Sequence, residues 1–277
     1  MTCLAGPIED AGVQRARGRV SLTVKRRGLR ASVIDRLHQD GSLKAVFPRG
    51  PSDRLDAVLV NTAGGVTGGD SFAIDAHATT GTQALITTQA AERIYRAQAG
   101  QTGSISAQIQ VDRDASLFWV PQETILFDAC NLNRVLAADV HPHGQFVMIE
   151  PVVFGREASG ETLQTGMLRD AVTIRSGGKP IYMDRVKLDG SLAQKLPRPA
   201  VAAGARAMAN IVVVRPDAAA DLAPIRQILS PHGYATQLRE TVVVGRILCA
   251  DSFVLRQALM PLLDMLTANR PPKNWRL

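Results

Sequence analysis

The run Ile105-Ser-Ala-Gln-Ile-Gln-Val111 alternates apolar and polar side chains without a break. Successive side chains of a β-strand point to opposite faces of a sheet, so this period of two predicts a strand with one buried face. An amphipathic helix would place its apolar residues three and four positions apart, which this run does not do.

Similar short runs continue on both sides of this stretch, and polar or Gly/Pro-containing turns separate them. They are Val20–Val24, Ala57–Asn61, Phe72–Ala76, Gln83–Thr88, Leu117–Val120, Thr124–Phe127, Val135–Val140 and Gln145–Phe154. Ala171–Ile174 and Pro180–Met183 flank Ser176-Gly-Gly178, a sequence typical of a β-hairpin. The chain up to about residue 190 is therefore expected to be a procession of short strands.

The last third has a different pattern. Ile211–Val214 and Thr241–Val244 are predicted strands, Asp217–Leu229 carries apolar residues on one helical face, and a second helix is expected after Asp251 or Ser252. Pro261 is expected to kink or restart that second helix. We therefore expect a mainly β (α+β) protein: a flexible leader over 1–19 and one domain over 20–277. That domain has a β-rich body to about residue 205 and a small βαβα portion with two helices over 206–277.

Composition excludes several classes of protein. The chain has 277 residues, 45% of them hydrophobic, which is an ordinary globular profile. Its three cysteines are far apart and no N-terminal apolar run resembles a signal peptide, so we expect a cytoplasmic protein and no membrane span. The net charge is +7, because 26 Arg and 6 Lys outnumber 25 acidic residues, and it fits an acidic protein partner or nucleic acid.

The most glycine-rich segment is Asn61-Thr-Ala-Gly-Gly-Val-Thr-Gly-Gly-Asp70. A phosphate-binding loop needs Lys-Ser/Thr after its last glycine, whereas here Asp70 follows Gly69 and would repel phosphate. A strand pattern rather than a helix comes next, which also argues against a dinucleotide-binding fingerprint. We interpret Gly64, Gly65, Gly68 and Gly69 as a tight turn or as a place where another backbone comes close.

No catalytic motif stands out. Acidic residues lie near strand ends, among them Glu123, Asp128, Glu150 and Glu161, but no spacing selects a pair. Gly155–Glu161 is a charged loop that contains Arg156. Two alternatives stay open: a β-rich hydrolase that uses a carboxylate pair, and a protein that binds nucleic acid through its basic N-terminal cluster, which lacks stacking aromatics.

Several segments, in order, resemble the urease accessory protein D family, also called UreH. They are Leu43–Arg49, Val60–Asp70, Thr87–Arg96 (TTQAAERIYR), Trp119–Asp128 (WVPQETILFD), Phe154–Glu161 (FGREASGE) and the tail around Trp275. The resemblance runs from about residue 20 to the C-terminus, and the glycine-rich and Pro-Gln-Glu segments are specific in combination.

The resemblance implies a β-helix-like stack of mixed sheets with two C-terminal helices. It implies a non-enzymatic scaffold and metallochaperone that binds apo-urease and the urease F- and G-type accessory proteins. No cofactor is expected to be tightly bound, and the family interior is proposed to conduct nickel through a polar passage. We hypothesise that Glu123, Asp128, Glu150 and Glu161 line that passage, because spaced carboxylate oxygens would bind a hydrated divalent ion weakly enough to release it.

Overall fold

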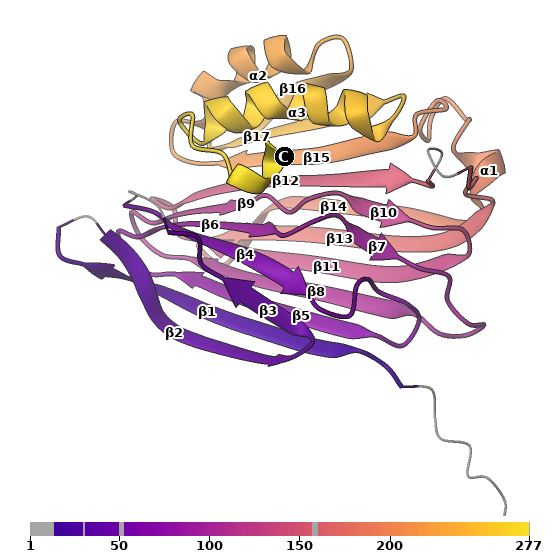
Figure 1. Cartoon of the computed structure of the whole chain (residues 1–277). Helices are drawn as coiled ribbons and strands as arrows, with labels where there is room; N and C mark the ends of the chain where they lie inside the picture. Colours follow the sequence, from indigo (N-terminus) through magenta and orange to yellow (C-terminus); the bar gives the residue numbers. More distant parts are fainter. Residues whose placement is uncertain (1–13, 30, 50–52, 157–159, 277) are drawn as a thin grey trace, which may run out of the picture.

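The computed structural model describes residues 14–29, 31–49, 53–156 and 160–276. It confirms the mainly β fold class: two sheets stack face to face, and helices cover the far side of one of them (Figure 1). No helix in the described part of the chain has the length and apolar character needed to cross a bilayer.

The first sheet has seven strands. In spatial order they are β14 (Lys179–Ser191), β13 (Thr165–Ser176), β11 (Cys130–Val140), β8 (Gly103–Val111), β5 (Ser71–Ala78), β1 (Arg17–Arg27) and β2 (Ala31–Gly41). The five inner strands pair in parallel, whereas the edge strands β2 and β14 pair antiparallel to their neighbours. The Ile105–Val111 run that predicted a strand is the end of β8, at the centre of this sheet.

The second sheet has ten strands. Its main path is β16 (Gly233–Arg239), β17 (Val242–Cys249), β15 (Ala207–Val214), β12 (Gln145–Phe154), β9 (Ser116–Trp119), β6 (Gln83–Thr88), β4 (Leu55–Asn61) and β3 (Leu43–Val46). Two short strands extend it, since β10 (Thr124–Leu126) pairs with β12 and β7 (Glu92–Ile94) pairs with β10.

From β4 to β13 the chain passes back and forth between the two sheets. Strands β5, β8, β11 and β13 lie side by side in the first sheet, and the segments between them supply β6, β9 and β12 to the second. Between neighbouring strands the chain crosses to the other sheet and returns, so these strands run in the same direction and pair in parallel. This is the β-helix-like stack that the family resemblance implied.

Two hydrophobic layers hold the structure together. The first lies between the sheets and includes Leu136, Phe146 and Met148. The second lies between the ten-stranded sheet and the helices and includes Ile149, Ile211 and Leu259. Because β12 and β15 are covered on both faces, nearly all their residues are buried, which explains their continuous apolar sequences.

The C-terminal portion contains both predicted helices, α2 (Leu222–Leu229) and α3 (Ser252–Leu266). The Asp251 side chain caps α3 by accepting a hydrogen bond from the Val254 N–H at 2.8 Å. The order is βαββα rather than βαβα, since β16 precedes β17. Only Ala235 of β16 is buried, so this edge strand lacks the apolar alternation that reveals a strand. Short helices α1 (Leu192–Lys195), η2 (Ala218–Asp221) and η3 (Lys273–Trp275) complete the fold.

Two local expectations differ from the structure. Strand β1 begins at Arg17 rather than Val20, because the backbone from Arg17 to Arg19 pairs with β5; residues 1–13 of the expected leader lie outside the described residues. Helix α3 runs through Pro261 as one helix, so it does not restart there, and the kink stays a prediction. Pro261 and Gln257 are exposed, so water can satisfy the Gln257 carbonyl that loses its helical partner.

Candidate functional site

A cavity of about 270 Å³ lies between the two sheets, and we call it the chamber. Its walls are mostly apolar, including Leu59, Phe72 and Ile105. Polar side chains enter it from both sheets: Asn61, Glu92, Trp119, Gln122, Thr124, Arg134 and Glu150. A cavity that sets polar groups among apolar walls is a usual form of a ligand-binding site.

Two residues that line the chamber, Arg134 and Glu150, belong to a charged network. Arg134 on β11 donates to Asp170 on β13, with Nε 3.0 Å from Oδ1 and Nη2 2.6 Å from Oδ2. Its Nη2 is also 3.4 Å from Oε2 of Glu150 on β12. The indole N–H of Trp119 donates to Oε1 of Glu150 at 2.9 Å. The network therefore joins the two sheets through their interior.

The strand register explains why these charges are buried. Glu150 stands in the row Phe146, Met148, Val152 and Phe154 of β12, whose side chains all point between the sheets. Arg134 stands among Leu132, Leu136 and Ala138 of β11 in the same way, and Asp170 is its direct partner across β13. Each charge therefore occupies a core position of its strand.

The Glu150 carboxylate is incompletely satisfied. The residue is 3% exposed, and its Oε2 atom receives no hydrogen bond. Burial raises the pKa of Glu150 above its ordinary value, and the nearby Arg134 guanidinium opposes that shift. The network contains two carboxylates and one guanidinium, so with both carboxylates ionised it carries an excess negative charge that a cation would offset.

Glu92 is a second chamber carboxyl, on β7. Burial raises its pKa to about 7, although a hydrogen bond from Asn61 at 3.0 Å favours the ionised form. The same Asn61 amide donates to the Gly65 carbonyl at 2.9 Å. Glu92 is thus tied to the glycine-rich segment and can change its protonation state near neutral pH.

The glycine-rich segment packs tightly beside β7. Gly64, Gly65 and Gly69 have positive φ angles of 77°, 155° and 89°. A Cβ atom on Gly65 would lie 2.7 Å from the Arg93 carbonyl and would also collide with the Tyr95 ring. These findings agree with a turn that another backbone approaches closely.

Gly68 and Asp70 complete this turn. A Cβ on Gly68 would lie 2.7 Å from the Cβ of Gln101. The buried Asp70 carboxylate accepts backbone N–H bonds from Thr67 and Ala16, each at 2.8 Å. Asp70 therefore fastens the turn to the residue that precedes β1.

Of the four carboxylates that the sequence suggested for a passage, Glu150 is the one that lines the chamber. Glu123 pairs with Arg256 of α3 at 2.7 Å. Asp128 accepts the backbone N–H groups of Gln164 and Thr165 at 3.0 and 2.9 Å. Burial works to raise the pKa of Asp128, but these bonds lower it overall. The side chains of Glu123 and Asp128 therefore hold neighbouring segments together.

Glu161 and Arg156 pair with each other at 2.6 Å on the surface. The Arg156 guanidinium also lies 4.0 Å from the centre of the Phe127 ring. Residues 157–159 of this predicted loop lie outside the described residues. The pair therefore belongs to a separate surface rather than to the chamber.

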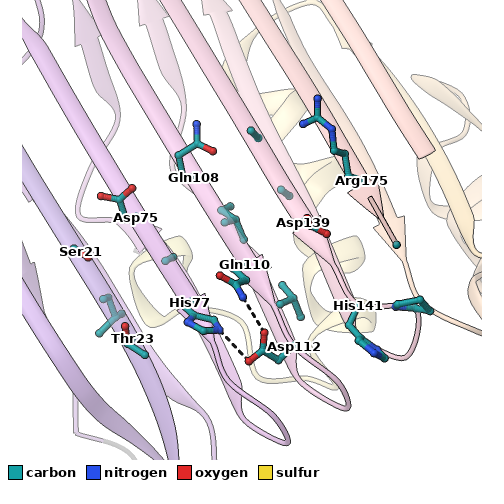
Figure 2. A pocket seen from close by; sticks show the side chains of 18 residues that line it. Ser21, Thr23, Asp75, His77, Gln108, Gln110, Asp112, Asp139, His141 and Arg175 are labelled. Atoms are coloured by element: carbon teal, nitrogen blue, oxygen red, sulfur yellow. Dashed lines mark hydrogen bonds and ion pairs between the residues drawn. The ribbon is translucent and has the colours of Figure 1, made fainter. Parts of the chain in front are cut away.

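A second, wider hollow of about 680 Å³ opens on the outer face of the seven-stranded sheet. Figure 2 shows His77 and Gln110 pointing toward Asp112, with Asp75 on the same strand as His77 and with Asp139 and Arg175 on β11 and β13. The His77 ring is 3.0 Å and the Gln110 amide 3.2 Å from the Asp112 carboxylate. Among the described residues, no three His, Cys, Asp or Glu side chains are grouped to hold a metal ion, in this hollow or in the chamber.

Sequence reasoning missed Arg134, Trp119, Asn61 and Glu92 as chamber residues. A signal existed for Arg134 and Glu150, because each interrupts the apolar row of an alternating strand. No comparable signal existed for Glu92 and Asn61, which meet only through the path of the glycine-rich turn.

Comparison with known proteins gives one consistent result. A family model described as UreD urease accessory protein matches residues 16–276. The urease accessory protein UreD of Roseobacter denitrificans is 47% identical over 246 residues, covering 89% of this chain and 90% of the relative. The UreD protein of Ruegeria pomeroyi is 43% identical over 258 residues, which cover 93% of this chain and 100% of that protein. The UreD protein of Agrobacterium fabrum is 40% identical over 265 residues, which cover 95% of this chain and 92% of that protein.

Proposed function

The chain belongs to the UreD family of urease accessory proteins, and we propose that in this role it is a non-enzymatic scaffold that conducts nickel to urease. In this proposal it binds apo-urease and the F- and G-type accessory proteins. Nickel is the cargo, and it passes through the chamber between the sheets during urease maturation.

The observation that carries this proposal is the buried, incompletely satisfied carboxylate of Glu150 inside the chamber. A desolvated carboxylate with one open oxygen favours a cation. The chamber offers two carboxyl groups, those of Glu150 and Glu92, with an indole and amide groups. That set is a poor permanent metal site, because divalent ions bound to protein usually take four or more ligands. Such a site suits an ion that enters, retains water and leaves.

Arg134 gives the chamber a resident cation. Its guanidinium lies beside both Glu150 and Asp170, so one of the two negative charges is offset while nickel is absent. Asp170 holds it by two hydrogen bonds, whereas Glu150 is only an ion-pair neighbour. A passing ion can therefore approach Glu150 without displacing Arg134 from Asp170.

The chamber also weighs against the hydrolase alternative. Paired carboxylates in a glycosidase need different protonation states and access to substrate. Here Glu150 and Asp170 share one guanidinium and are both largely buried, and Glu150 lines a cavity of only about 270 Å³. That volume suits a hydrated ion better than a sugar polymer.

Co-expression tests the scaffold role. The tagged chain is produced with its cognate apo-urease and F- and G-type proteins, and co-purification is followed together with nickel-dependent urease activity. We expect urease and the F-type protein to be retained, and activity to disappear when this chain is omitted. Retention of neither partner, with activity unaffected by omission, would refute the proposal.

Fluorescence tests the passage itself. The protein has two tryptophans, and the W275F variant leaves Trp119 in the chamber as the reporter. Added Ni²⁺ should quench its emission in a saturable way, since the indole donates to Glu150 at 2.9 Å. In W275F/E150Q the saturable component should vanish. Equal quenching in both variants would place nickel elsewhere.

A further inference from the structure

The chamber has a mouth at the protein surface. Glu150 is buried, whereas the lining residues Gln89 and Ala90 are exposed, so the chamber reaches water beside them. Two chain segments supply lining residues here. The first rim segment, residues 88–92, leads from β6 into β7, and the second rim segment, residues 120–123, leads from β9 to β10.

The two rim segments contact each other directly. The Glu92 N–H donates to the Glu123 carbonyl at 2.8 Å. The Gln122 N–H donates to the hydroxyl oxygen of Thr88 at 2.9 Å. The distance between the two rim segments therefore sets the width of the mouth.

Asn274, in the short helix η3 near the end of the chain (yellow in Figure 1), binds both rim segments. Its side-chain amide donates to the backbone carbonyls of Thr88 at 2.6 Å and of Gln89 at 3.3 Å. Its own carbonyl accepts a hydrogen bond from the Gln122 side chain at 3.0 Å. One residue thus bridges the two sides of the mouth.

The next residue, Trp275, fixes the position of Asn274. Trp275 is 1% exposed, and its indole N–H donates to the Val120 carbonyl at 3.1 Å. The guanidinium of Arg256 on α3 lies 5.0 Å from the centre of the Trp275 ring. The same guanidinium donates to the side chains of Gln122 at 2.9 Å and Glu123 at 2.7 Å. Helix α3, η3 and the second rim segment therefore form one frame, to which Asn274 ties the first rim segment.

Packing alone does not explain an asparagine at position 274. Its Oδ1 atom is buried and receives no hydrogen bond from the described part of the chain. An unpaired buried acceptor costs free energy, which an apolar side chain of the same size would avoid. What asparagine offers in return is its amide donor, and both acceptors of that donor lie in the first rim segment.

We propose that Asn274 is a positioning residue that fixes the width of the chamber mouth by holding the first rim segment against the second. This inference rests on the proposed function, because the mouth is where a cation would enter or leave the chamber. Without the Asn274 amide, the first rim segment separates from the second more often, and water enters the chamber.

Hydrogen–deuterium exchange of the full chain tests the positioning role. N274A removes the amide donor, and N274D removes it while keeping the shape of the side chain. The reporters are the N–H groups of Glu92 and Gln122, which join the rim segments. Loss of two hydrogen bonds should raise their exchange rates by about tenfold or more.

Two controls separate this effect from general destabilisation. R276A alters the same segment, but the Arg276 side chain pairs with Asp264 of α3, so exchange at the reporters should stay at the wild-type rate. Exchange within β8, at the centre of the seven-stranded sheet, should stay the same in all variants.

The second readout is nickel-dependent activation of the cognate apo-urease. N274A and N274D should lose activation while they retain the co-purified partners, because the mouth no longer keeps its width. R276A should activate normally.

Four outcomes would contradict the inference. Wild-type exchange at both reporters in N274A and N274D would overturn the positioning role and leave the proposed function standing. Equally faster exchange in β8 would make Asn274 a general stabilising residue. Faster exchange at the reporters with normal activation would overturn a role of the mouth in nickel delivery. Activation that does not need this chain at all would overturn the proposed function, whereas the exchange rates would still show whether Asn274 holds the rim segments together.

Discussion

Arg134 on the seven-stranded sheet and Glu150 on the ten-stranded sheet face each other across the interior, with Nη2 3.4 Å from Oε2. Both side chains are nearly inaccessible to water. Such a pair adds little net stability compared with apolar residues of the same size, yet loss of one partner is expensive. The pair is therefore more easily explained by a role in the chamber than by the stability of the fold.

The Glu150 carboxylate is expected to be needed for nickel delivery. E150Q keeps the shape and retains an acceptor for the Trp119 N–H, but removes the charge that attracts a cation. Nickel-dependent urease activation should fall by about tenfold, which corresponds to roughly 1.4 kcal/mol, while co-purified partners stay the same. D75N on the outer sheet face is the control and should activate normally. Loss of the complex in E150Q would instead give Glu150 a structural role.

Removal of Arg134 should destabilise the fold strongly. R134M leaves Glu150 and Asp170 buried without a counter-charge, at a cost of about 3–5 kcal/mol in the free energy of unfolding. The triple variant R134M/E150L/D170V should recover most of that loss, because no charge remains unpaired. Urea denaturation measures the free energy of unfolding of both variants. R169M, at an exposed position of β13, is the control. A mild R134M phenotype would mean that water reaches the network.

Glu92 should make stability depend on pH. Its pKa rises from 4.5 to about 7 on folding, so the folded state binds its proton more tightly than the unfolded state does. Stability is therefore lost as the pH rises from about 4.5 through about 7, by up to roughly 3 kcal/mol. E92Q removes this dependence, so its advantage over wild type should grow by about 2 to 3 kcal/mol between about pH 5 and about pH 8. Parallel pH profiles for the two proteins would exclude a raised Glu92 pKa.

Neighbouring glycines should respond differently to substitution. A Cβ on Gly65 would meet the Arg93 carbonyl at 2.7 Å, whereas a Cβ on Gly64 would meet nothing within 4 Å. Both residues have positive φ, so G64A should cost only about 1 kcal/mol of conformational strain. G65A adds a collision and should cost at least about 2 kcal/mol more. Similar melting temperatures for the two variants would mean that β7 shifts easily.

The fold was largely predictable because its signal is local. Ile105–Val111 alternates because its strand is buried on one face, whereas β12 and β15 are apolar throughout because both of their faces are covered. The residue types of a strand therefore indicate which of its faces are buried. Strand β16 was missed because an exposed edge strand needs no apolar row. Pairing order could not be read from residue type, since neighbouring strands of the stack are far apart in the sequence.

The chamber was less predictable than the fold. Sequence singled out acids near strand ends, but a carboxylate's role depends on which face of the strand it occupies and what lies opposite. Glu150 and Glu123 both lie near strand ends, yet one faces the chamber and the other pairs with Arg256. Arg134 could have been noticed in its apolar row, whereas its contact with Glu150 depends on how the two sheets stack.

The helical cover of the ten-stranded sheet is encoded at the end of the chain. Strand β12 and its neighbour β15 are complete long before α3, which supplies Leu255, Leu259 and Leu262 to their outer apolar face. While the ribosome is still synthesising the C-terminal portion, that face has no cover from its own chain. A newly made molecule must therefore pass through a stage in which a broad aliphatic surface is open to water, and surface exposed in this way is prone to aggregation.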